Sequence, residues 1–431
     1  MALSSRQFVN ICKRCALRIN TDPANSSLLS NSTSPNLKFY ALLSHAIPIQ
    51  YKNNSLMRDK NLFEVSYQMR EYGLWGLGGK KNLDTAVSDA EKIVGYPTSF
   101  LSLRCLLSDE MSNVALHMRK LVGTKHPLLK TARGMVFDGN HNLQMKGLFV
   151  MLISKAAGPS PQDDFVHEEM VSGVYPNQRS LAEIMEIIHT SYLIHKGVVN
   201  LESVLPEHGP VADMEFGNKM AVLSGDYLLA SACRGLAKLG NPKVVEEVAS
   251  SIADMMTAEF TNYTDPDGKQ MIPQSCQGFS DWLKQTYFSI GSLLAKSCQS
   301  AMRLAGHSDH FKNMAFAFGE NVSYAEQLAQ DIKPFTSADE LPGLSLTSAP
   351  VLLYRERVPA EEFTNLERLW QEGPANYHEI VSLVLKSGAV SYCKELLEQY
   401  RDKAISSLDC YSESEAKSAL VNMVNAVSHV R

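Results

Sequence analysis

The sequence predicts an all-α protein with the architecture of a helical bundle. From residue 84 onward, apolar residues recur at intervals of three and four, which places them on one face of an α-helix. Small residues stand between the large apolar ones, so neighbouring helices can approach closely. No stretch alternates as a half-buried strand would, and no repeat with a period of roughly 20–50 residues is evident. We therefore expect roughly a dozen helices in a single domain over residues 84–431.

The helices are predicted from their caps, apolar faces and breaks. Asp84 is expected to cap the first helix of the domain. Three apolar faces follow it: Leu181, Ile184, Met185, Ile188 and Tyr192; then Phe216, Met220, Leu223 and Tyr227; then Leu283, Tyr287, Ile290, Leu294 and Ala301. Clusters of proline and glycine predict breaks at residues 206–210, 240–242, 265–273 and 334–350.

Composition excludes several classes of protein. The chain has 431 residues, 45% of them hydrophobic and 20% charged, with a formal net charge of −5. This profile is typical of a soluble globular protein. Because acidic and basic residues are mixed along the chain, no nucleic-acid partner is predicted. No run of about 20 apolar residues occurs, so no transmembrane segment is expected.

The N-terminal residues have the composition of a targeting segment. Residues 1–20 contain Arg6, Lys13, Arg14 and Arg18 and no acidic residue, and Ser, Asn and Thr crowd residues 21–34. This predicts an organelle transit peptide and disordered leader over residues 1–55, followed by a linker over 56–83. The alternative is a disordered tail whose composition is accidental.

Common catalytic and metal motifs are absent or incomplete. Glu186 and His189 form a Glu-x-x-His pair, but a di-iron bundle needs a second copy on another helix, which the sequence lacks. A polar helix face explains the pair better. No Gly-x-Ser-x-Gly elbow is present, and no cysteine lies in a recognisable catalytic context.

The most specific signal is a block that begins at Leu181 and ends at Leu229. Its second half reads Gly-Asn-Lys-x-Ala-x-Leu-x-Gly-Asp-x-Leu from Gly217. This block resembles the trans-polyprenyl diphosphate synthases, which lengthen an allylic diphosphate by isopentenyl units. The resemblance extends from about residue 85 to the C-terminus, and it implies an isoprenoid-synthase-like helical bundle over residues 84–431. Within the family, residues 194–200, 293–298 and 313–316 resemble the second, non-catalytic subunit of decaprenyl or solanesyl diphosphate synthases.

The chemistry of that family depends on metal ions and carboxylates. Cleavage of the carbon–oxygen bond leaves a carbocation and a pyrophosphate, which Mg²⁺ must neutralise. Such ions need hard oxygen ligands from facing helices. The family supplies them as two aspartate-rich motifs, and basic residues hold the second diphosphate.

Both aspartate motifs are degenerate in this chain. In the first, Lys196, Gly197 and Asn200 stand where the family has aspartates. In the second, Gln330, Asp331 and Pro334 stand at the aspartate positions, so only Asp331 is kept. A lysine about 5 Å from Mg²⁺ would be repelled by up to roughly 7 kcal/mol at an effective dielectric constant of about 20. We therefore predict no metal site and no catalytic residue in this chain.

The diphosphate-binding positions of the family are degenerate as well. The upstream basic site aligns with Gln144 and Lys146, which keeps one positive charge, and the later Lys-Thr pair aligns with Ser289 and Ile290. No substrate-binding residue is expected. A self-sufficient synthase with unusual ligands is the contrary hypothesis, and Asp226 and Asp331 would be its only residual carboxylates of note.

The resemblance therefore implies a non-catalytic, regulatory subunit of a heteromeric polyprenyl diphosphate synthase. It implies a mitochondrial heterotetramer in the matrix that makes the side chain of ubiquinone, with Mg²⁺ held by the catalytic partner and no cofactor in this chain. Such enzymes pair along a helix interface. Our candidates for that interface are Gly217, Asn218, Lys219, Gly225 and Asp226. The alternative is an independent helical protein that binds a lipid or another protein.

Overall fold

The computed structural model describes most of the chain after residue 79. The described residues are 80–95, 124–129, 145–160, 170–204, 206–261, 270–272, 276 and 278–429. The predicted transit peptide, nearly all of the predicted linker and Gln144 lie outside them.

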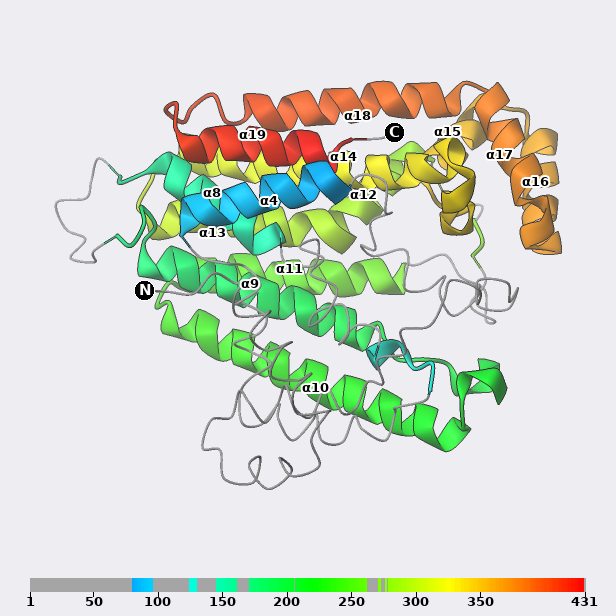
Figure 1. The fold of residues 1–431 in the computed structure, drawn as a ribbon, viewed down its shortest axis with the longest axis horizontal. Coiled ribbons are helices and arrows are strands. Elements are labelled where there is room, and N and C mark those ends of the chain that lie inside the picture. The colour runs from blue at the N-terminus through cyan, green and yellow to red at the C-terminus, as the bar shows by residue number, and fades with distance from the viewer. Residues whose placement is uncertain are drawn as a thin grey trace, which may run out of the picture. The chain divides into compact units, whose positions relative to one another are not determined.

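The regular elements in the described part of the chain are helical, which confirms the predicted all-α class (Figure 1). The α-helices are α4 (Lys80–Val94), α8 (Met145–Ala157), α9 (Pro176–His195), α10 (Val211–Lys238), α11 (Pro242–Phe260), α12 (Phe279–Thr286), α13 (Ser292–Leu304), α14 (Asp309–Thr336), α15 (Ala349–Arg357), α16 (Ala360–Glu372), α17 (Tyr377–Lys386), α18 (Ala389–Ser406) and α19 (Glu415–Val427). Short 3₁₀ helices are η5 (Leu201–Ser203), η6 (Pro206–His208), η8 (Ala338–Gly343) and η9 (Pro374–Asn376), and η7 (Tyr287–Gly291) is a π-helix. Among these described helices, none has both the length and the apolar character that crossing a bilayer requires.

The described residues fall into two compact units. The first unit holds residues 124–129 and the described part of 186–234, which includes the C-terminal half of α9 and most of α10. Its core consists of Leu128, Ile194, Met220, Ala221 and Leu228. The second unit holds α4, α8, the N-terminal half of α9 and the described residues from 235 onward.

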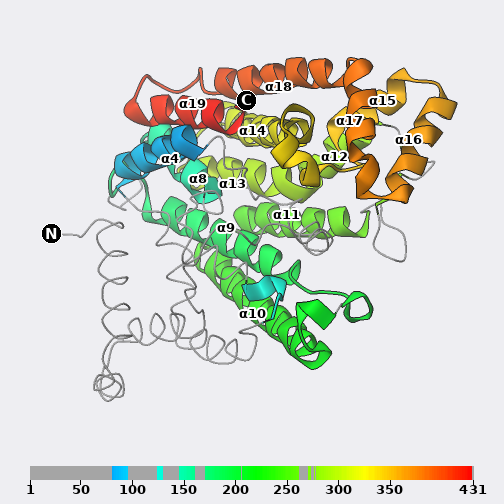
Figure 2. The ribbon, with the colours of Figure 1, turned by 45° about the vertical axis from the view of Figure 1, so that its right-hand side comes forward.

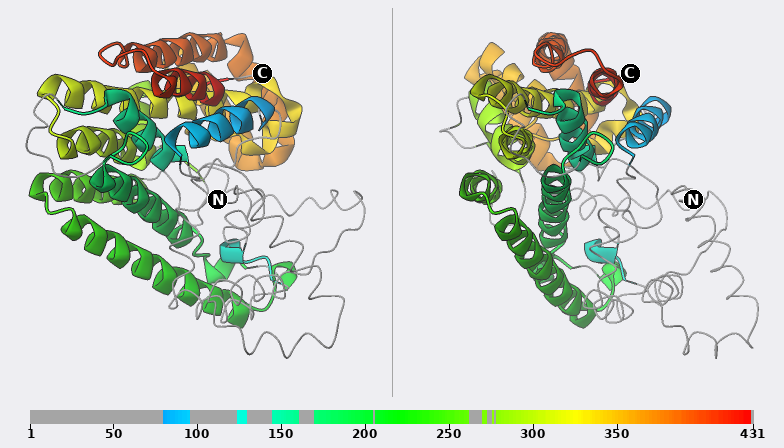
Figure 3. Two further views of the ribbon diagram at one scale, coloured as in Figure 1. Left: turned by 60° about the vertical axis from the view of Figure 1, so that its left-hand side comes forward. Right: turned by 90° about the vertical axis from the view of Figure 1, so that its left-hand side faces the viewer.

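Helix α14 is the centre of the second unit. This 28-residue helix packs against α13 and α18, and α19 packs against α8 and α4 (Figures 2 and 3). Phe318 on α14 meets Phe149 of α8 edge to face, with ring centroids 5.8 Å apart. Gly319 lets α14 approach α13 closely, because a Cβ there would lie 2.8 Å from backbone atoms of Ala295. Residues at this crossing are therefore limited in size by the backbone itself.

The predicted helical faces are confirmed in part. All five residues of the first face, from Leu181 to Tyr192, are buried. In the second face the prediction is wrong for Leu223, which is 52% exposed on α10. The third face is divided by the π-helix at Tyr287–Gly291, where one extra residue per turn shifts the register. Asp84 does not cap a helix, because α4 begins at Lys80 and continues through it.

Candidate functional site

The degenerate first motif directly follows α9 in the first unit. Helix α9 ends at His195, and the amide of Gly197 donates to the carbonyl of Ile194 at 3.0 Å. The ammonium of Lys196 lies 5.6 Å from the centre of the Tyr192 ring. The side chain of Asn200 accepts a hydrogen bond from the amide of Glu202 at 3.1 Å and so caps η5. Lys196 and Asn200 therefore contact their own chain locally.

Gly197 occupies a confined position. The residue is buried, and a Cβ built on it would lie 3.0 Å from the carbonyl oxygen of Ile194 and 3.6 Å from the amide nitrogen of Leu128. The side chain of Pro127 is also close, with its Cβ 3.8 Å away. A side chain at this position would be in tight contact with the carbonyl of Ile194 and in ordinary contact with Pro127 and Leu128.

Asn218 of α10 holds the chain just after the first motif. Its amide forms two hydrogen bonds of 2.8 Å to Val199, accepting from the backbone N–H and donating to the carbonyl. The Oδ1 atom of Asn218 also lies 3.2 Å from Nε2 of His126. Nδ1 of His126 accepts from the amide of Leu128 at 3.1 Å, so the proton of a neutral ring resides on Nε2 and is donated to Asn218. Burial lowers the pKa of His126, in keeping with a neutral ring.

Two glycines of the predicted interface make room for histidine rings within the same unit. Gly217 and Gly225 are buried, and a Cβ on Gly217 would overlap the ring of His126. A Cβ on Gly225 would overlap the ring of His195 in the same way. Nε2 of His195 lies 3.3 Å from the carbonyl oxygen of Val222. Within the first unit, Gly217 therefore allows α10 to pack closely on the 124–129 segment, and Gly225 allows it to pack closely on the end of α9.

Only two of the five predicted interface residues are exposed. Lys219 and Asp226 are exposed on α10, whereas Asn218 is half-buried. Val222 and Leu223 stand between them in the sequence and are 43% and 52% exposed. We call these four residues (Lys219, Val222, Leu223 and Asp226) the outer face of α10. An exposed apolar patch with a polar rim is a feature of protein contact surfaces.

The degenerate second motif lies in the last turns of α14, in the second unit. Its one carboxylate, Asp331, accepts hydrogen bonds from three nitrogen donors. Oδ2 accepts from Nε1 of Trp282 on α12 and from the backbone amide of Ala349 at the start of α15, both at 2.8 Å. Oδ1 accepts from Nε2 of Gln327, one turn earlier on α14, at 2.7 Å. We call this carboxylate with its three donors the Asp331 clamp.

Burial raises the pKa of Asp331 from its ordinary value of 3.8 to about 6, against the hydrogen bonds from Ala349, Gln327 and Trp282, which lower it. In the unfolded chain the carboxyl loses its proton near pH 3.8, whereas in the folded chain it keeps the proton until about pH 6. Between these values the folded state binds more protons, so stability must fall as pH rises.

We predict that the wild-type chain loses up to about 3 kcal/mol of unfolding free energy between pH 4 and pH 7 relative to Asp331→Asn. The asparagine cannot ionise. The difference between the two proteins therefore removes the pH dependence that other carboxyls with raised pKa values contribute to both. Urea unfolding of both proteins across this range measures the difference. A difference that is constant with pH would contradict the raised pKa.

Lys146, at a degenerate diphosphate position, and Lys333, next to the second motif's Pro334, both interact with one buried carboxylate. Lys146 on α8 and Lys333 on α14 both favour ionisation of Glu326, whose pKa is raised by burial. Glu326 is only 9% exposed. Burial lowers the pKa of Lys333, while the negative charges of Glu340 and Glu326 act in the opposite direction and raise it. The positive charges that remain at these positions are thus balanced within the second unit.

The family's Lys-Thr position lies on the π-helix between α12 and α13. Ser289 is buried, and its hydroxyl donates to the carbonyl of Thr286 at 3.4 Å. Ile290 offers no polar group. Although π-helices occur often at functional sites, this one carries no cation to hold a diphosphate.

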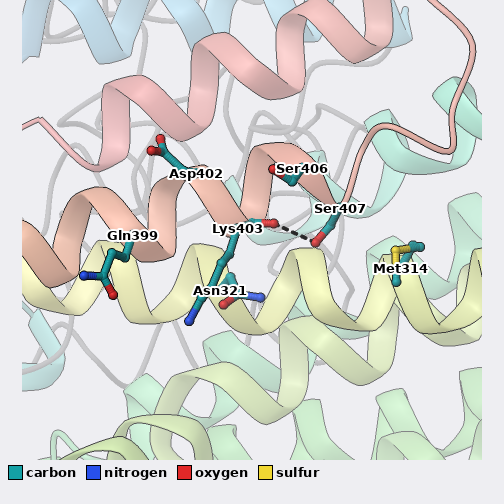
Figure 4. A pocket seen from close by; sticks show the side chains of 7 residues that line it. All are labelled: Met314, Asn321, Gln399, Asp402, Lys403, Ser406 and Ser407. Carbon is teal, nitrogen blue, oxygen red and sulfur yellow. Dashed lines mark hydrogen bonds between the residues drawn. The ribbon is translucent and has the colours of Figure 1, made fainter.

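A surface groove of about 550 Å³ lies between α14 and α18 (Figure 4). Its lining residues are Met314, Asn321, Gln399, Asp402, Lys403, Ser406 and Ser407. The hydroxyl of Ser407 donates to the carbonyl of Lys403 at 2.8 Å, and the ammonium of Lys403 lies 4.8 Å from the Tyr400 ring centre. None of the predicted site or interface residues lines this groove, although Met314 belongs to the 313–316 segment singled out from the sequence.

The residues at the degenerate motifs do not fit a magnesium cluster. Such a cluster needs several hard oxygen ligands with free lone pairs. The three positions of the first motif carry an ammonium, no side chain, and an amide oxygen that already caps η5. At the second motif three nitrogen donors surround Asp331. Among the described residues, no group of three or more His, Cys, Asp or Glu side chains is arranged to hold a metal ion.

Sequence reasoning missed His126, Trp282 and Ala349. Trp282 is 49 positions from Asp331, and His126 is 92 positions from Asn218, so no local spacing reveals either contact. Gln327 was within reach of the sequence, because Gln and Asp four residues apart on a helix pair commonly.

Comparisons with known proteins define the class to which this fold and these motif positions belong. Residues 139–345 match the family model described as polyprenyl synthetase. The chain is also 46% identical to a mouse relative over 346 residues, which cover 79% of this chain and 86% of the relative. The chain therefore belongs to the polyprenyl synthetase family.

The relatives include mammalian and fungal proteins and a bacterial enzyme of known structure. The mouse protein is named "All trans-polyprenyl-diphosphate synthase PDSS2", and the human protein of the same name matches with the same identity and coverage. A Neurospora crassa protein named "Probable hexaprenyl pyrophosphate synthase, mitochondrial" is 30% identical, over 74% of this chain and 79% of its own. The crystal structure of a polyprenyl synthase from Caulobacter crescentus, complexed with calcium and isoprenyl diphosphate, superposes with a TM-score of 0.57 at 21% identity. That structure matches 81% of this chain and 98% of its own, and it supports the fold.

Proposed function

We propose that this chain is the non-catalytic, regulatory subunit of a heteromeric trans-polyprenyl diphosphate synthase. The observation that carries the proposal is the state of the one retained motif carboxylate. All three donors around Asp331 belong to the chain's own fold. With Lys196, Gly197 and Asn200 at the first motif, the chain keeps the family's helices without its metal ligands.

The product of the complex is the isoprenoid side chain of ubiquinone, and the complex works in mitochondria, in the matrix. The name of the Neurospora relative supports a mitochondrial setting. The basic, acid-poor composition of residues 1–20 supports import into that organelle.

The partner is the catalytic polyprenyl diphosphate synthase subunit, which supplies the aspartates and binds Mg²⁺. We propose a heterotetramer in which the outer face of α10 contributes to the contact. Val222 and Leu223 provide apolar area there, while Lys219 and Asp226 provide charges of opposite sign. The role of this chain is to stabilise the catalytic subunit in its productive arrangement.

Reconstitution tests the assignment. Loss of a single group that stabilises the transition state reduces turnover by roughly 10²–10³-fold, so losses at both motifs should leave no measurable elongation by this chain alone. Co-expression with the catalytic subunit should give a stable complex with Mg²⁺-dependent elongation. Allylic diphosphate and radiolabelled isopentenyl diphosphate provide the assay, and each chain expressed alone provides the control.

Two outcomes would contradict the proposal. The first is Mg²⁺-dependent elongation by this chain alone. The second is a monomer that carries bound lipid and ignores the catalytic subunit, which would support an independent binding protein. A paired substitution of Val222 and Leu223 by glutamate should weaken the complex at least about 10-fold if the outer face of α10 is part of it. The matched control is Val211→Glu, because Val211 is also on α10 and 52% exposed.

A further inference from the structure

The retained aspartate of the second motif joins three helices of the second unit. Asp331 lies on α14, its donor Trp282 lies on α12, and its donor Ala349 is the first residue of α15. The indole of Trp282 stacks on Phe279, with ring centroids 5.1 Å apart and planes 11° from parallel. Its N–H is thereby aimed at Asp331 by a ring that has little freedom to turn.

Asp331 performs for α15 the task that a capping residue usually performs. The residue before α15, Ser348, makes no side-chain capping hydrogen bond. The amide of Ala349 is one of the N-terminal donors that a helix leaves without an internal partner, and the carboxylate of Asp331 accepts from it. A negative charge at a helix N-terminus is also favoured by the helix dipole.

Helix α15 is attached to the segment before α12 at its other end as well. Nη1 of Arg355 donates to the carbonyl of Cys276 at 3.1 Å, and the carboxylate of Glu356 accepts from the amide of Phe279 at 2.6 Å. Phe279 is the first residue of α12. Gly278 adopts φ +80°, and a Cβ there would overlap Glu356. Contacts at both ends of α15 thus close a ring that passes through α12 and returns to Asp331.

A metal ion would have to compete with this ring. A carboxylate offers about four lone-pair positions, and three are occupied by the N–H groups of Trp282, Gln327 and Ala349. The neighbouring motif positions, Gln330 and Pro334, contribute no second carboxylate. Two of the donors are the indole N–H of Trp282 on α12 and the backbone amide of Ala349 on α15, so displacing them would release α12 or α15 from Asp331.

We propose that Asp331 is a structural clamp that fixes α12 and α15 on α14 without a metal ion. This explains why one aspartate stands in an otherwise degenerate motif. The inference concerns this chain's own architecture and holds whether or not the chain acts as a subunit of a synthase.

Two substitutions of Asp331 separate a clamp from a metal ligand. In Asp331→Asn the side-chain oxygen can still accept from Trp282 and Ala349, while Gln327 can turn its amide to offer oxygen. At pH 7 this variant should melt within about 2 °C of wild type, whereas Asp331→Ala should melt about 5 °C lower, in the full-length chain. The amide of Ala349 and the first turn of α15 should exchange hydrogen faster only in Asp331→Ala.

Magnesium and a second donor complete the test. Melting of the wild-type chain should be the same in MgCl₂ and in EDTA, because no ion binds the clamp. Trp282→Phe keeps the stacked ring but removes one donor, so it should lower the melting temperature by about half as much as Asp331→Ala. It also serves as the reporter if Asp331→Ala does not fold. Asp339→Ala, at an exposed position after α14, is the matched control and should melt like wild type.

The proposal is overturned if Mg²⁺ raises the melting temperature of wild type and Asp331→Asn abolishes that rise. It is also overturned if Asp331→Ala has the melting temperature and hydrogen exchange of wild type. If Asp331→Ala cannot be purified, a Trp282→Phe variant that melts like wild type overturns it.

Discussion

Replacing Gly319 by valine should lower the free energy of unfolding of the second unit by about 3 kcal/mol. A Cβ at this position would lie 2.8 Å from the nitrogen and Cα of Ala295, and 3.0 Å from the carbonyl carbon of Leu294. All three are backbone atoms of α13, so no side chain can rotate away to make room. The two helices must separate, and the packing of Phe318 on α14 is lost with them.

Urea unfolding followed by far-ultraviolet circular dichroism measures this change. Gly343→Ala is the control, because the nearest atom to its Cβ would be Cγ of Pro334 at 3.7 Å, an ordinary contact. That variant should stay within about 0.5 kcal/mol of wild type. Equal stabilities for the two variants would show that α13 and α14 do not cross at Gly319.

The second large effect is expected at Asn218 in the first unit. Asn218→Ala removes the partner of the Val199 amide, of the Val199 carbonyl and of Nε2 of His126. Leaving such groups unpaired costs about 1–3 kcal/mol each when they are buried. We expect a total loss of about 3 kcal/mol, since Val199 is only partly buried and water can replace part of what is lost.

Hydrogen exchange at Val199 provides a local measurement of the same contact. The amide of Val199 should exchange much faster in Asn218→Ala than in wild type, while amides in α14 should be unchanged. Lys219→Ala, the exposed neighbour on the same helix, should alter neither exchange nor stability. Retained protection at Val199 in Asn218→Ala would contradict the role assigned to the asparagine.

The sequence predicted the fold class correctly, because helical periodicity is a local pattern. The face from Leu181 to Tyr192 has a helical period, and all five residues are buried as expected. Leu223 shows the limit of that reasoning, since periodicity identifies an apolar stripe without saying whether it faces the core. In the predicted stripe on α10, Met220 is buried, whereas Leu223 is 52% exposed.

The roles of the specific residues needed the structure, because their partners are distant in the chain. Gly217 and Gly225 were recognised as part of a motif, yet the rings that require them belong to His126 and His195. Asp331 could be read from the sequence only as a residual carboxylate. Its donors come from α12 and from the start of α15, and only folding brings them together.

The confined position of Gly197 makes the loss of the first motif difficult to reverse. A single substitution back to aspartate would put a Cβ 3.0 Å from the carbonyl oxygen of Ile194, a tight contact, and in ordinary contact with Pro127 and Leu128. It would also leave Lys196 and Asn200 at the other two positions of the motif. For protein engineers, a catalytic metal site would therefore need changes at several positions, and Gly197 is a tightly packed one among them.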